Sequence, residues 1–190
     1  MSLSIVRFED VAPQPWKNGG GVTREMLAWP VVDDWLMRLS VADIDRDGPF
    51  SAFVGFDRWF AVLAGNGVRL GAPPQTIQRA DDALHFDGAS APDCTLIDGP
   101  TRDLNLMIRR DVASGWMKRV AMGFVFTAGA GLSGVFALEG CTLSERGERD
   151  VVVPPMSIAW RVDVLDAAPW RISDCLDDAL LFAFYCAARS

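Results

Sequence analysis

The segment best suited to small-molecule chemistry is a glycine-rich loop at residues 15–25, which read PWKNGGGVTRE. Three glycines let the backbone approach a ligand closely, and successive N–H groups in such a loop can form an anion-binding concavity. Asn18, Thr23, Arg24 and Glu25 add an amide, a hydroxyl, a guanidinium and a carboxylate. The lysine precedes the glycines, so the phosphate-binding pattern GxxxxGK[ST] is absent. The alternative interpretation is a surface loop with a structural Arg24–Glu25 pair.

A second candidate segment is the strand predicted over residues 35–41, WLMRLSV. Alternation places Arg38 and Ser40 on one face of this strand. We expect the opposite face to point into the core, and it carries Trp35, Met37, Leu39 and Val41. In a barrel the Arg38 face borders the cavity, whereas in an isolated strand it faces solvent.

A third candidate segment is the strand predicted over residues 103–110, DLNLMIRR. Asp103, Asn105 and Arg109 share one face of this strand, and Leu104, Leu106 and Ile108 share the core face. An Asp, an Asn and an Arg together can hydrogen-bond a small polar acid. The alternative is the polar outer face of an edge strand.

Residues for nucleophilic or metal chemistry are few. The one histidine, His85, cannot form a multi-histidine metal centre, and the four cysteines (Cys94, Cys141, Cys175 and Cys186) have no CxxC spacing. The sequence contains no GxSxG elbow and no Cys with a neighbouring His. His85 is therefore either a general base or a structural residue between apolar neighbours. We expect no bound metal and no cofactor.

The elements that must position these segments are short strands. Turn signals recur at short intervals between short apolar or alternating runs, a pattern typical of an all-β sandwich or barrel. The string FAVLAG at residues 60–65 resembles VFALEG at residues 135–140, and a short strand follows each glycine. Each copy predicts a hairpin, so the repeat indicates two related β-barrel halves packed tightly on each other.

Composition excludes several classes of protein. Of 190 residues, 50% are hydrophobic and 23% are charged, which excludes intrinsic disorder. The net charge of −7 and the pI of about 4.6 argue against nucleic-acid binding. No apolar run has the length of a membrane span or of a signal-peptide h-region, so we expect a cytoplasmic protein without a membrane partner.

Five strings taken together resemble the HutD/Ves family, and they occur in the family's order within about the first 110 residues. They lie at residues 16–25 (WKNGGGVTRE), 38–42 (RLSVA), 47–58 (DGPFSAFVGFDR), 63–70 (LAGNGVRL) and 103–110 (DLNLMIRR). The resemblance implies a cupin-like protein of two fused β-barrels, with genes among those for histidine utilization and formate-like or N-formylated acid ligands. It implies no established enzymatic activity. The chain departs from metal-binding cupins, which need several histidines.

We therefore predict an all-β bicupin, that is, two fused cupin-like jelly-roll barrels in one compact unit over residues 1–190. The approximate halves are residues 1–112 and 113–190. The predicted function is non-enzymatic binding of a small carboxylic acid, formate or an N-formylated amino acid, which modulates histidine utilization or related catabolism. The alternatives are a metal-free hydrolase or isomerase with Glu25 or His85 as its base, and an interaction module with a vestigial cavity.

The predicted ligand site gathers the polar side chains of the three segments at one barrel mouth. Arg24 or Arg38 would supply the guanidinium fork for a carboxylate, since bidentate charged pairs are strong, and Glu25 or Asp103 would orient it. A homodimer is an open alternative for the assembly. The predicted site residues are Asn18, Thr23, Arg24, Glu25, Arg38, Ser40, Asp103, Asn105 and Arg109.

Overall fold

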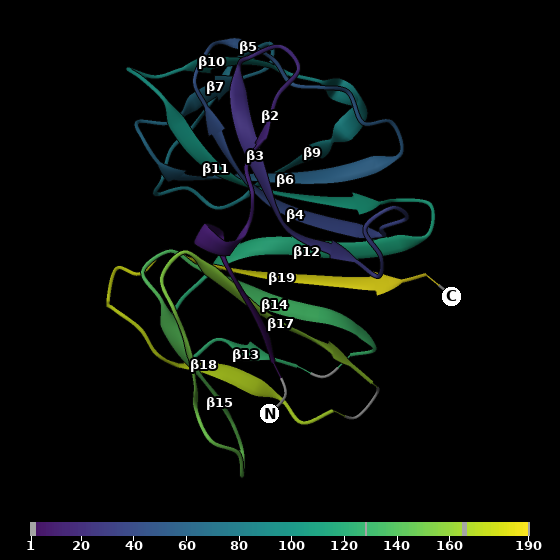
Figure 1. The fold of residues 1–190 in the computed structure, drawn as a ribbon, viewed down its shortest axis with the longest axis vertical. Coiled ribbons are helices and arrows are strands. Elements are labelled where there is room, and N and C mark those ends of the chain that lie inside the picture. Colours follow the sequence, from purple (N-terminus) through teal and green to yellow (C-terminus); the bar gives the residue numbers. More distant parts are fainter. Residues whose placement is uncertain (1–2, 128, 165–166, 190) are drawn as a thin grey trace. The chain divides into compact units, whose positions relative to one another are not determined.

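The computed structural model describes residues 3–127, 129–164 and 167–189, and its regular elements are almost all strands (Figure 1). Two short 3-10 helices, η1 (Phe8–Asp10) and η2 (Gly88–Ser90), are the only helices among these residues. This confirms the all-β prediction. No helix in the described part of the chain is long and apolar enough to cross a membrane.

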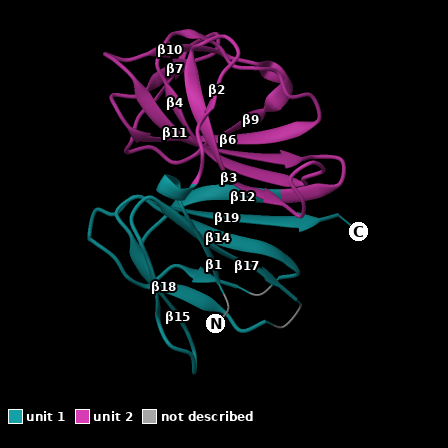
Figure 2. Cartoon of the chain, viewed as in Figure 1, with its two compact units in different colours: residues 1–10, 115–190 teal, residues 11–114 magenta. Residues whose placement is uncertain are grey.

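The chain divides into two compact units (Figure 2). Unit 2 comprises residues 11–114, and unit 1 comprises residues 1–10 together with 115–190. This boundary falls close to the predicted one between residues 112 and 113. The N-terminal segment nevertheless belongs to unit 1, because β1 (Ser4–Arg7) pairs with β17 (Ser157–Asp163).

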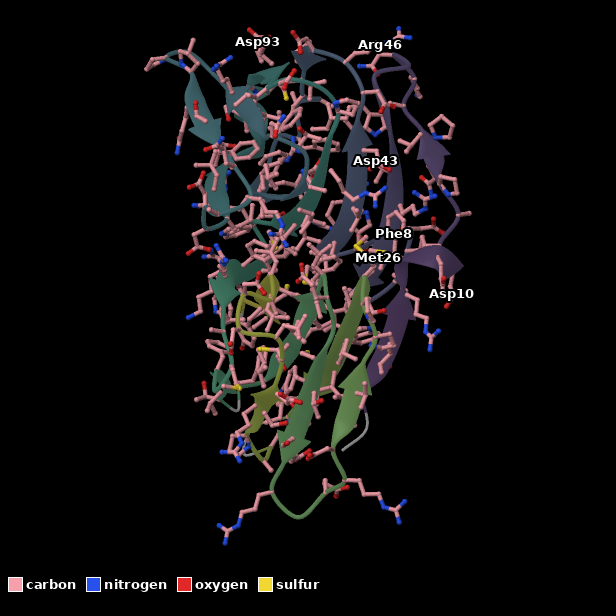
Figure 3. All side chains as sticks on the ribbon, turned by 90° about the vertical axis from the view of Figure 1, so that its left-hand side faces the viewer. Phe8, Asp10, Met26, Asp43, Arg46 and Asp93 are labelled. Atoms are coloured by element: carbon pink, nitrogen blue, oxygen red, sulfur yellow. The ribbon has the colours of Figure 1, made fainter. Side chains whose placement is uncertain are left out.

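Unit 2 consists of two antiparallel sheets. The six-stranded sheet has the order β2 (Gln14–Pro15), β3 (Gly21–Trp29), β4 (Met37–Ile44), β11 (Thr101–Arg109), β6 (Phe56–Ala64) and β9 (Leu84–Asp87). The four-stranded sheet has the order β5 (Gly48–Pro49), β10 (Asp93–Leu96), β7 (Val68–Leu70) and β8 (Gln75–Ile77). Arg46, in the loop before β5, and Asp93, the first residue of β10, lie at the same end of this unit (Figure 3).

Unit 1 also consists of two sheets. The five-stranded sheet has the order β1, β17, β14 (Gly131–Ala137), β19 (Leu181–Ala188) and β12 (Ala113–Val120). The four-stranded sheet has the order β13 (Val125–Phe126), β18 (Trp170–Asp174), β15 (Cys141–Glu145) and β16 (Val151–Val153).

The two units share one strand order. The series β9-β6-β11-β4 in unit 2 corresponds to β17-β14-β19-β12 in unit 1, and β5-β10-β7-β8 corresponds to β13-β18-β15-β16. Gly65 and Gly140 occupy the same turn in the two units, between β6 and β7 and between β14 and β15, with φ angles of 88° and 95°. Because glycine adopts positive φ without steric cost, the repeated glycine marks the repeated turn. The predicted repeat of strands is therefore found, but the predicted hairpins are wrong, because each glycine joins a strand of the large sheet to a strand of the small sheet.

Each unit has its own apolar core between its two sheets. In unit 2, Phe60 and Val62 of the large sheet pack in one cluster with Val68 and Ile77 of the small sheet. Burying an apolar side chain of this size contributes about 1.5–3 kcal/mol, so these contacts hold the two sheets together. The core of unit 1 is built in the same way around Val135, Leu181 and Trp170 among others.

The predicted closed barrels are not found. Within the described residues, β8 pairs only with β7 and β9 pairs only with β6, so hydrogen bonds do not join the two sheets of unit 2 into a ring. Alternation and frequent turns are common to sandwiches and barrels, so the sequence pattern did not distinguish them. The observed units are pairs of open sheets.

Candidate functional site

A cavity of about 410 Å³ lies within unit 2. Its floor is the inner face of the six-stranded sheet, and the remaining walls come from the segments at residues 14–18 and 49–53. The side chains that line it include cations, anions, amides and aromatic rings. They are Gln14, Pro15, Trp16, Lys17, Asn18, Thr23, Glu25, Arg38, Ser40, Ala42, Pro49, Phe50, Ser51, Phe53, Arg58, Asp103, Asn105 and Met107.

Strand register arranges the polar floor residues in three rows. The first row runs Thr23–Ala42–Asp103, and the second runs Glu25–Ser40–Asn105. The third row runs Arg38–Met107–Arg58 across β4, β11 and β6. Residues directly opposite each other on neighbouring strands have Cβ atoms about 5 Å apart, so side chains from four strands meet on one surface.

A β-bulge in β3 sets which residues of that strand reach the cavity. The register shifts between Glu25 and Leu27, where Met26 is the extra residue. After the bulge, Leu27 pairs with the buried Leu39 on the opposite face of the sheet. The bulge therefore ends the cavity-facing run of β3 at Glu25, as bulges commonly redirect side chains next to binding sites.

The third row supplies two arginines in an aromatic setting. The Arg58 Cζ atom lies 5.2, 5.4 and 5.1 Å from the ring centroids of Phe50, Phe53 and Phe86. The Arg38 Cζ atom lies 5.1 Å from the Trp35 centroid. Cations over aromatic faces are stabilised by the ring quadrupole, which helps to hold both guanidinium groups where water is scarce.

These two arginines retain unused hydrogen-bond donors. The buried Nε atoms of Arg38 and Arg58 have no hydrogen-bond partner in the protein. Arg38 has one carboxylate near it, with 3.9 Å between its Nη1 atom and the Oε2 atom of Glu25. Burial lowers the pKa of Arg58 to about 10, against the opposing effect of Asp103, and burial also lowers the pKa of Arg38, against Glu25. Both groups are desolvated cations that an anion would stabilise.

The first two rows supply buried acceptors. Asp103 and Asn105 are both buried, and the Oδ1 atom of each lacks a hydrogen-bond partner in the protein. Burial raises the pKa of Asp103 to about 8, with Arg58 opposing the rise and Asp43 adding to it. Buried polar groups are nearly always paired, so four unpaired polar atoms on side chains that line one cavity indicate a place prepared for a polar ligand.

The glycine loop forms a wall of the cavity, but its N–H groups do not form the predicted anion-binding concavity. The N–H of Gly19 donates to the Trp16 carbonyl at 3.0 Å, and the N–H of Gly20 donates to Oδ1 of Asn18 at 3.0 Å. A Cβ atom on Gly21 would lie 2.2 Å from the Asp43 carbonyl oxygen. The loop is therefore a tight turn into β3, and its contribution to the cavity is made by side chains.

Seven of the nine predicted site residues line this one cavity: Asn18, Thr23, Glu25, Arg38, Ser40, Asp103 and Asn105. Arg24 does not, because β3 already begins at Gly21 and alternation turns Arg24 to the other face. There its Nε atom donates to the Val11 carbonyl at 3.1 Å. Arg109 also does not line it, because its Nη1 atom pairs with Asp34 at 2.6 Å at the end of β11.

Sequence reasoning missed Arg58 and the aromatic residues of the cavity. Arg58 lies two residues before Phe60 and four before Val62, so the alternation of β6 places it on the inner face. Trp16 was noted only as a neighbour of the loop, yet its indole Nε1 donates to the Thr23 hydroxyl at 2.6 Å. That bond fixes the loop against β3 and positions the Thr23 side chain.

The remaining chemical candidates lie away from the cavity. His85 is stacked on Trp59 at 4.4 Å and lies 3.4 Å from Asp57, with its side chain about half exposed. Burial raises the pKa of the Cys94 thiol to about 12, which makes it a poor nucleophile. Among the described residues, no group of three or more His, Cys, Asp and Glu side chains is placed to hold a metal ion.

Each unit consists of two packed sheets, and unit 2 encloses a polar cavity. This architecture is that of a cupin-like β protein. A cupin 2 conserved barrel domain protein from Leptotrichia buccalis has a TM-score of 0.58 at 11% identity, covering 98% of this chain and 96% of that chain. A profile of the HutD family matches residues 8–160. Because this match covers most of the chain, the chain belongs to the HutD family.

Relatives in sequence agree with this assignment. An uncharacterised 21.2 kDa protein in the hutC 3' region of Pseudomonas putida is 41% identical over 110 residues, which are 55% of this chain and 57% of that protein. Protein Ves of Citrobacter koseri is 34% identical over 143 residues, which are 71% of this chain and 74% of that protein.

Two solved structures match over the full length of both chains. A conserved protein of unknown function from Pseudomonas aeruginosa PAO1 has a TM-score of 0.87 at 29% identity. HutD from Pseudomonas fluorescens SBW25, in a structure named for its formate condition, has a TM-score of 0.84 at 24% identity. These matches show that the chain shares its fold with both proteins.

Proposed function

We propose that this chain is a non-enzymatic protein that binds a small carboxylic acid in the cavity of unit 2. The ligand class is formate or an N-formylated amino acid, and occupancy of the cavity modulates histidine utilization or related amino-acid catabolism. The names of a relative in the hutC 3' region and of HutD itself support the pathway. The formate condition in the name of the HutD structure supports the ligand class.

One observation carries the proposal. Arg38 and Arg58 line one cavity on either side of Met107, and the buried Nε atom of each has no hydrogen-bond partner in the protein. A carboxylate is the smallest group that accepts from a guanidinium in the bidentate geometry that makes such pairs strong. It would also offset the desolvation of both cations.

Titration calorimetry with formate and N-formyl-L-glutamate tests the proposal on the full chain. We expect saturable binding by the parent, and a loss of about 30-fold or more in affinity for Arg38→Ala and for Arg58→Ala, since truncating one partner of a buried charge pair commonly costs 2–5 kcal/mol. Thermal unfolding of each variant reports whether the fold is retained.

Arg69→Ala is the matched control, because Arg69 is an exposed residue of β7 in the same unit. We expect this variant to bind as the parent does. Equal binding by the parent, Arg38→Ala and Arg58→Ala would exclude the cavity as the site. Absence of binding by the parent to any small acid would contradict the proposed function itself.

A metal-free enzyme acting on the same acid is the second candidate, and one residue favours it. Glu25 lines the cavity 3.9 Å from Arg38, where a carboxylate could act as a base. His85, the other predicted base, does not line the cavity. Product formation well above one equivalent of protein, followed by NMR and lost in Glu25→Gln, would favour this enzyme over the binding protein.

We also propose that the two units are a pair of cupin domains, that is, a bicupin. The shared strand order of the units and the shared glycine turns at Gly65 and Gly140 support this. A crystal structure in which each unit superposes on a single cupin domain over all eight common strands would test it.

A further inference from the structure

The cavity is lined by unpaired acceptors as well as by the two arginines proposed to bind the carboxylate. The Oδ1 atoms of Asp103 and Asn105 also lack a hydrogen-bond partner in the protein. These residues are only 2% and 9% exposed, and both line the cavity. An anion held by the arginines alone would leave both oxygens unpaired.

Donors and acceptors occupy separate parts of the floor. Asp103, Asn105 and Met107 are successive cavity-facing residues of β11, and successive residues on one face of a strand are about 6.7 Å apart. Arg38 and Arg58 flank Met107. The floor therefore presents cationic N–H donors at one end and oxygen acceptors at the other.

Asp103 keeps acceptor capacity in either protonation state. An ionised carboxylate accepts through both oxygens, and a protonated one still accepts through its carbonyl oxygen. Asn105 accepts through its amide oxygen. A ligand that satisfies the whole floor must carry hydrogen-bond donors as well as a carboxylate.

Unit 1 indicates that these polar groups are not required by the fold. Asp103 pairs with Val62 and Asn105 pairs with Phe60, three and five residues before Gly65. The corresponding pairs before Gly140 are Ala137 with Leu181 and Val135 with Ala183. The same sheet positions are therefore apolar and fully buried in unit 1.

We infer that the cavity selects acids that carry an N–H or O–H donor about three to five bonds from the carboxylate, with the donor bound by Asp103 and Asn105. This inference rests on the proposed function and narrows its ligand class. Formate, which has no such donor, would be a weak partial ligand. Amide, amino and hydroxy acids would be the preferred class.

Isomeric pairs of acids test the inference without a change in size. N-acetyl-L-glutamate has an amide N–H, whereas its isomer N-formyl-N-methyl-L-glutamate has none. Likewise 3-hydroxypropanoate has an O–H and its isomer methoxyacetate has none. We expect the parent to bind the donor-bearing member of at least one pair about tenfold or more tightly, since sites built to bond a ligand N–H or O–H reject analogues that lack it.

The double variant Asp103→Leu/Asn105→Ala copies the residues of unit 1 and should reduce this preference to within about threefold. Asn105→Ala alone is the second variant if the double variant unfolds. Asp45→Asn, an exposed aspartate at the end of β4, should retain the parent's preference.

Equal binding within both pairs, or binding confined to acids without a donor, would overturn the inference and leave the carboxylate site intact. Unchanged preference in the Asp103 and Asn105 variants would also overturn it. If the parent bound none of the four acids and no formate, the proposed function would fail and this inference with it.

Discussion

The two units have the same strand order but differ in what the large sheet presents to the interior. In unit 2 the paired strands β6 and β11 carry Arg58, Asp103 and Asn105 on the inner face. At the equivalent positions β14 and β19 carry Ser133, Leu181 and Ala183. Leu181 and Ala183 are thus apolar and fully buried where Asp103 and Asn105 line a polar cavity, and Ser133 is a buried residue hydrogen-bonded to Asp163 where Arg58 lines that cavity.

The difference shows which residues the fold needs and which it tolerates. Leu181 and Ala183 are fully buried within the core of unit 1 and stabilise it by ordinary burial. Asp103 and Asn105 occupy the same places, and the buried Oδ1 atom of each has no hydrogen-bond partner in the protein, at a cost to stability. A cost retained in one copy of a repeat indicates a function for that copy.

The largest expected effect on stability comes from placing the aspartate of unit 2, Asp103, at the equivalent position of unit 1, Leu181. Leu181→Asp buries a carboxyl group within the apolar core cluster of unit 1, and we expect it to lower the free energy of unfolding by about 4 kcal/mol or more. Urea unfolding of the full chain measures this. Val162→Asp, at an exposed site on β17, should change stability by less than about 0.5 kcal/mol. A similarly small effect of Leu181→Asp would mean that unit 1 can also hold a buried polar group.

The next effect is the pH dependence caused by Asp103. Its pKa in the folded protein is raised to about 8, so between about pH 4 and pH 8 the native state binds more protons than the unfolded state. Stability must therefore fall as the pH rises through this window, by up to about 1.4 kcal/mol per pH unit from this group. Asp103→Asn removes that slope.

The free energy of unfolding, measured at pH 6 and at pH 8 for the parent and for Asp103→Asn, tests this. We expect the free energy of unfolding of the parent to fall by about 2 kcal/mol more than that of Asp103→Asn over this interval. Asp45→Asn, which is exposed, should follow the parent. Parallel pH profiles for the parent and Asp103→Asn would show that the carboxyl is ionised at neutral pH.

A smaller effect is expected from substituting the two turn glycines of the repeat, Gly65 and Gly140. A Cβ atom on Gly65 would lie 2.4 Å from the Pro100 carbonyl oxygen, whereas on Gly140 its nearest neighbour is the Val153 carbonyl oxygen at 3.0 Å. Both positions have positive φ, which costs a non-glycine residue about 1 kcal/mol. We expect Gly65→Ala to destabilise by about 1–2 kcal/mol more than Gly140→Ala in thermal unfolding. The reverse order would mean that the backbone at Pro100 moves away from the added methyl group more easily than the backbone at Val153 does.

Several of the cavity residues and the repeat of the two units could be predicted from the sequence. Alternation correctly placed Arg38 with Ser40 and Asp103 with Asn105. The glycine strings correctly indicated a duplicated strand–turn–strand segment, although its two strands belong to different sheets and form no hairpin. These signals are local, because the period of a strand fixes its two faces wherever it pairs. The open sheets were not predicted, since closure depends on which edges meet.

The errors at the site have non-local causes. Arg24 was treated as a loop residue, but its backbone pairs with Val41 and so follows strand alternation. Arg109 has the right period for the cavity and is diverted by Asp34, 75 residues earlier in the chain. Arg58 was missed because only the pairing of β6 with β11 brings it beside Met107.

The most direct test of the acid site observes the two arginines themselves. In a ¹⁵N–¹H NMR spectrum of the full chain, the Nε–H signals of Arg38 and Arg58 are assigned from Arg38→Lys and Arg58→Lys. On titration with N-acetyl-L-glutamate we expect both signals to shift downfield and saturate together, because charge-assisted hydrogen bonds form at both groups. Saturation with these two signals unmoved, or with shifts confined to unit 1, would contradict the cavity of unit 2 as the site of acid binding.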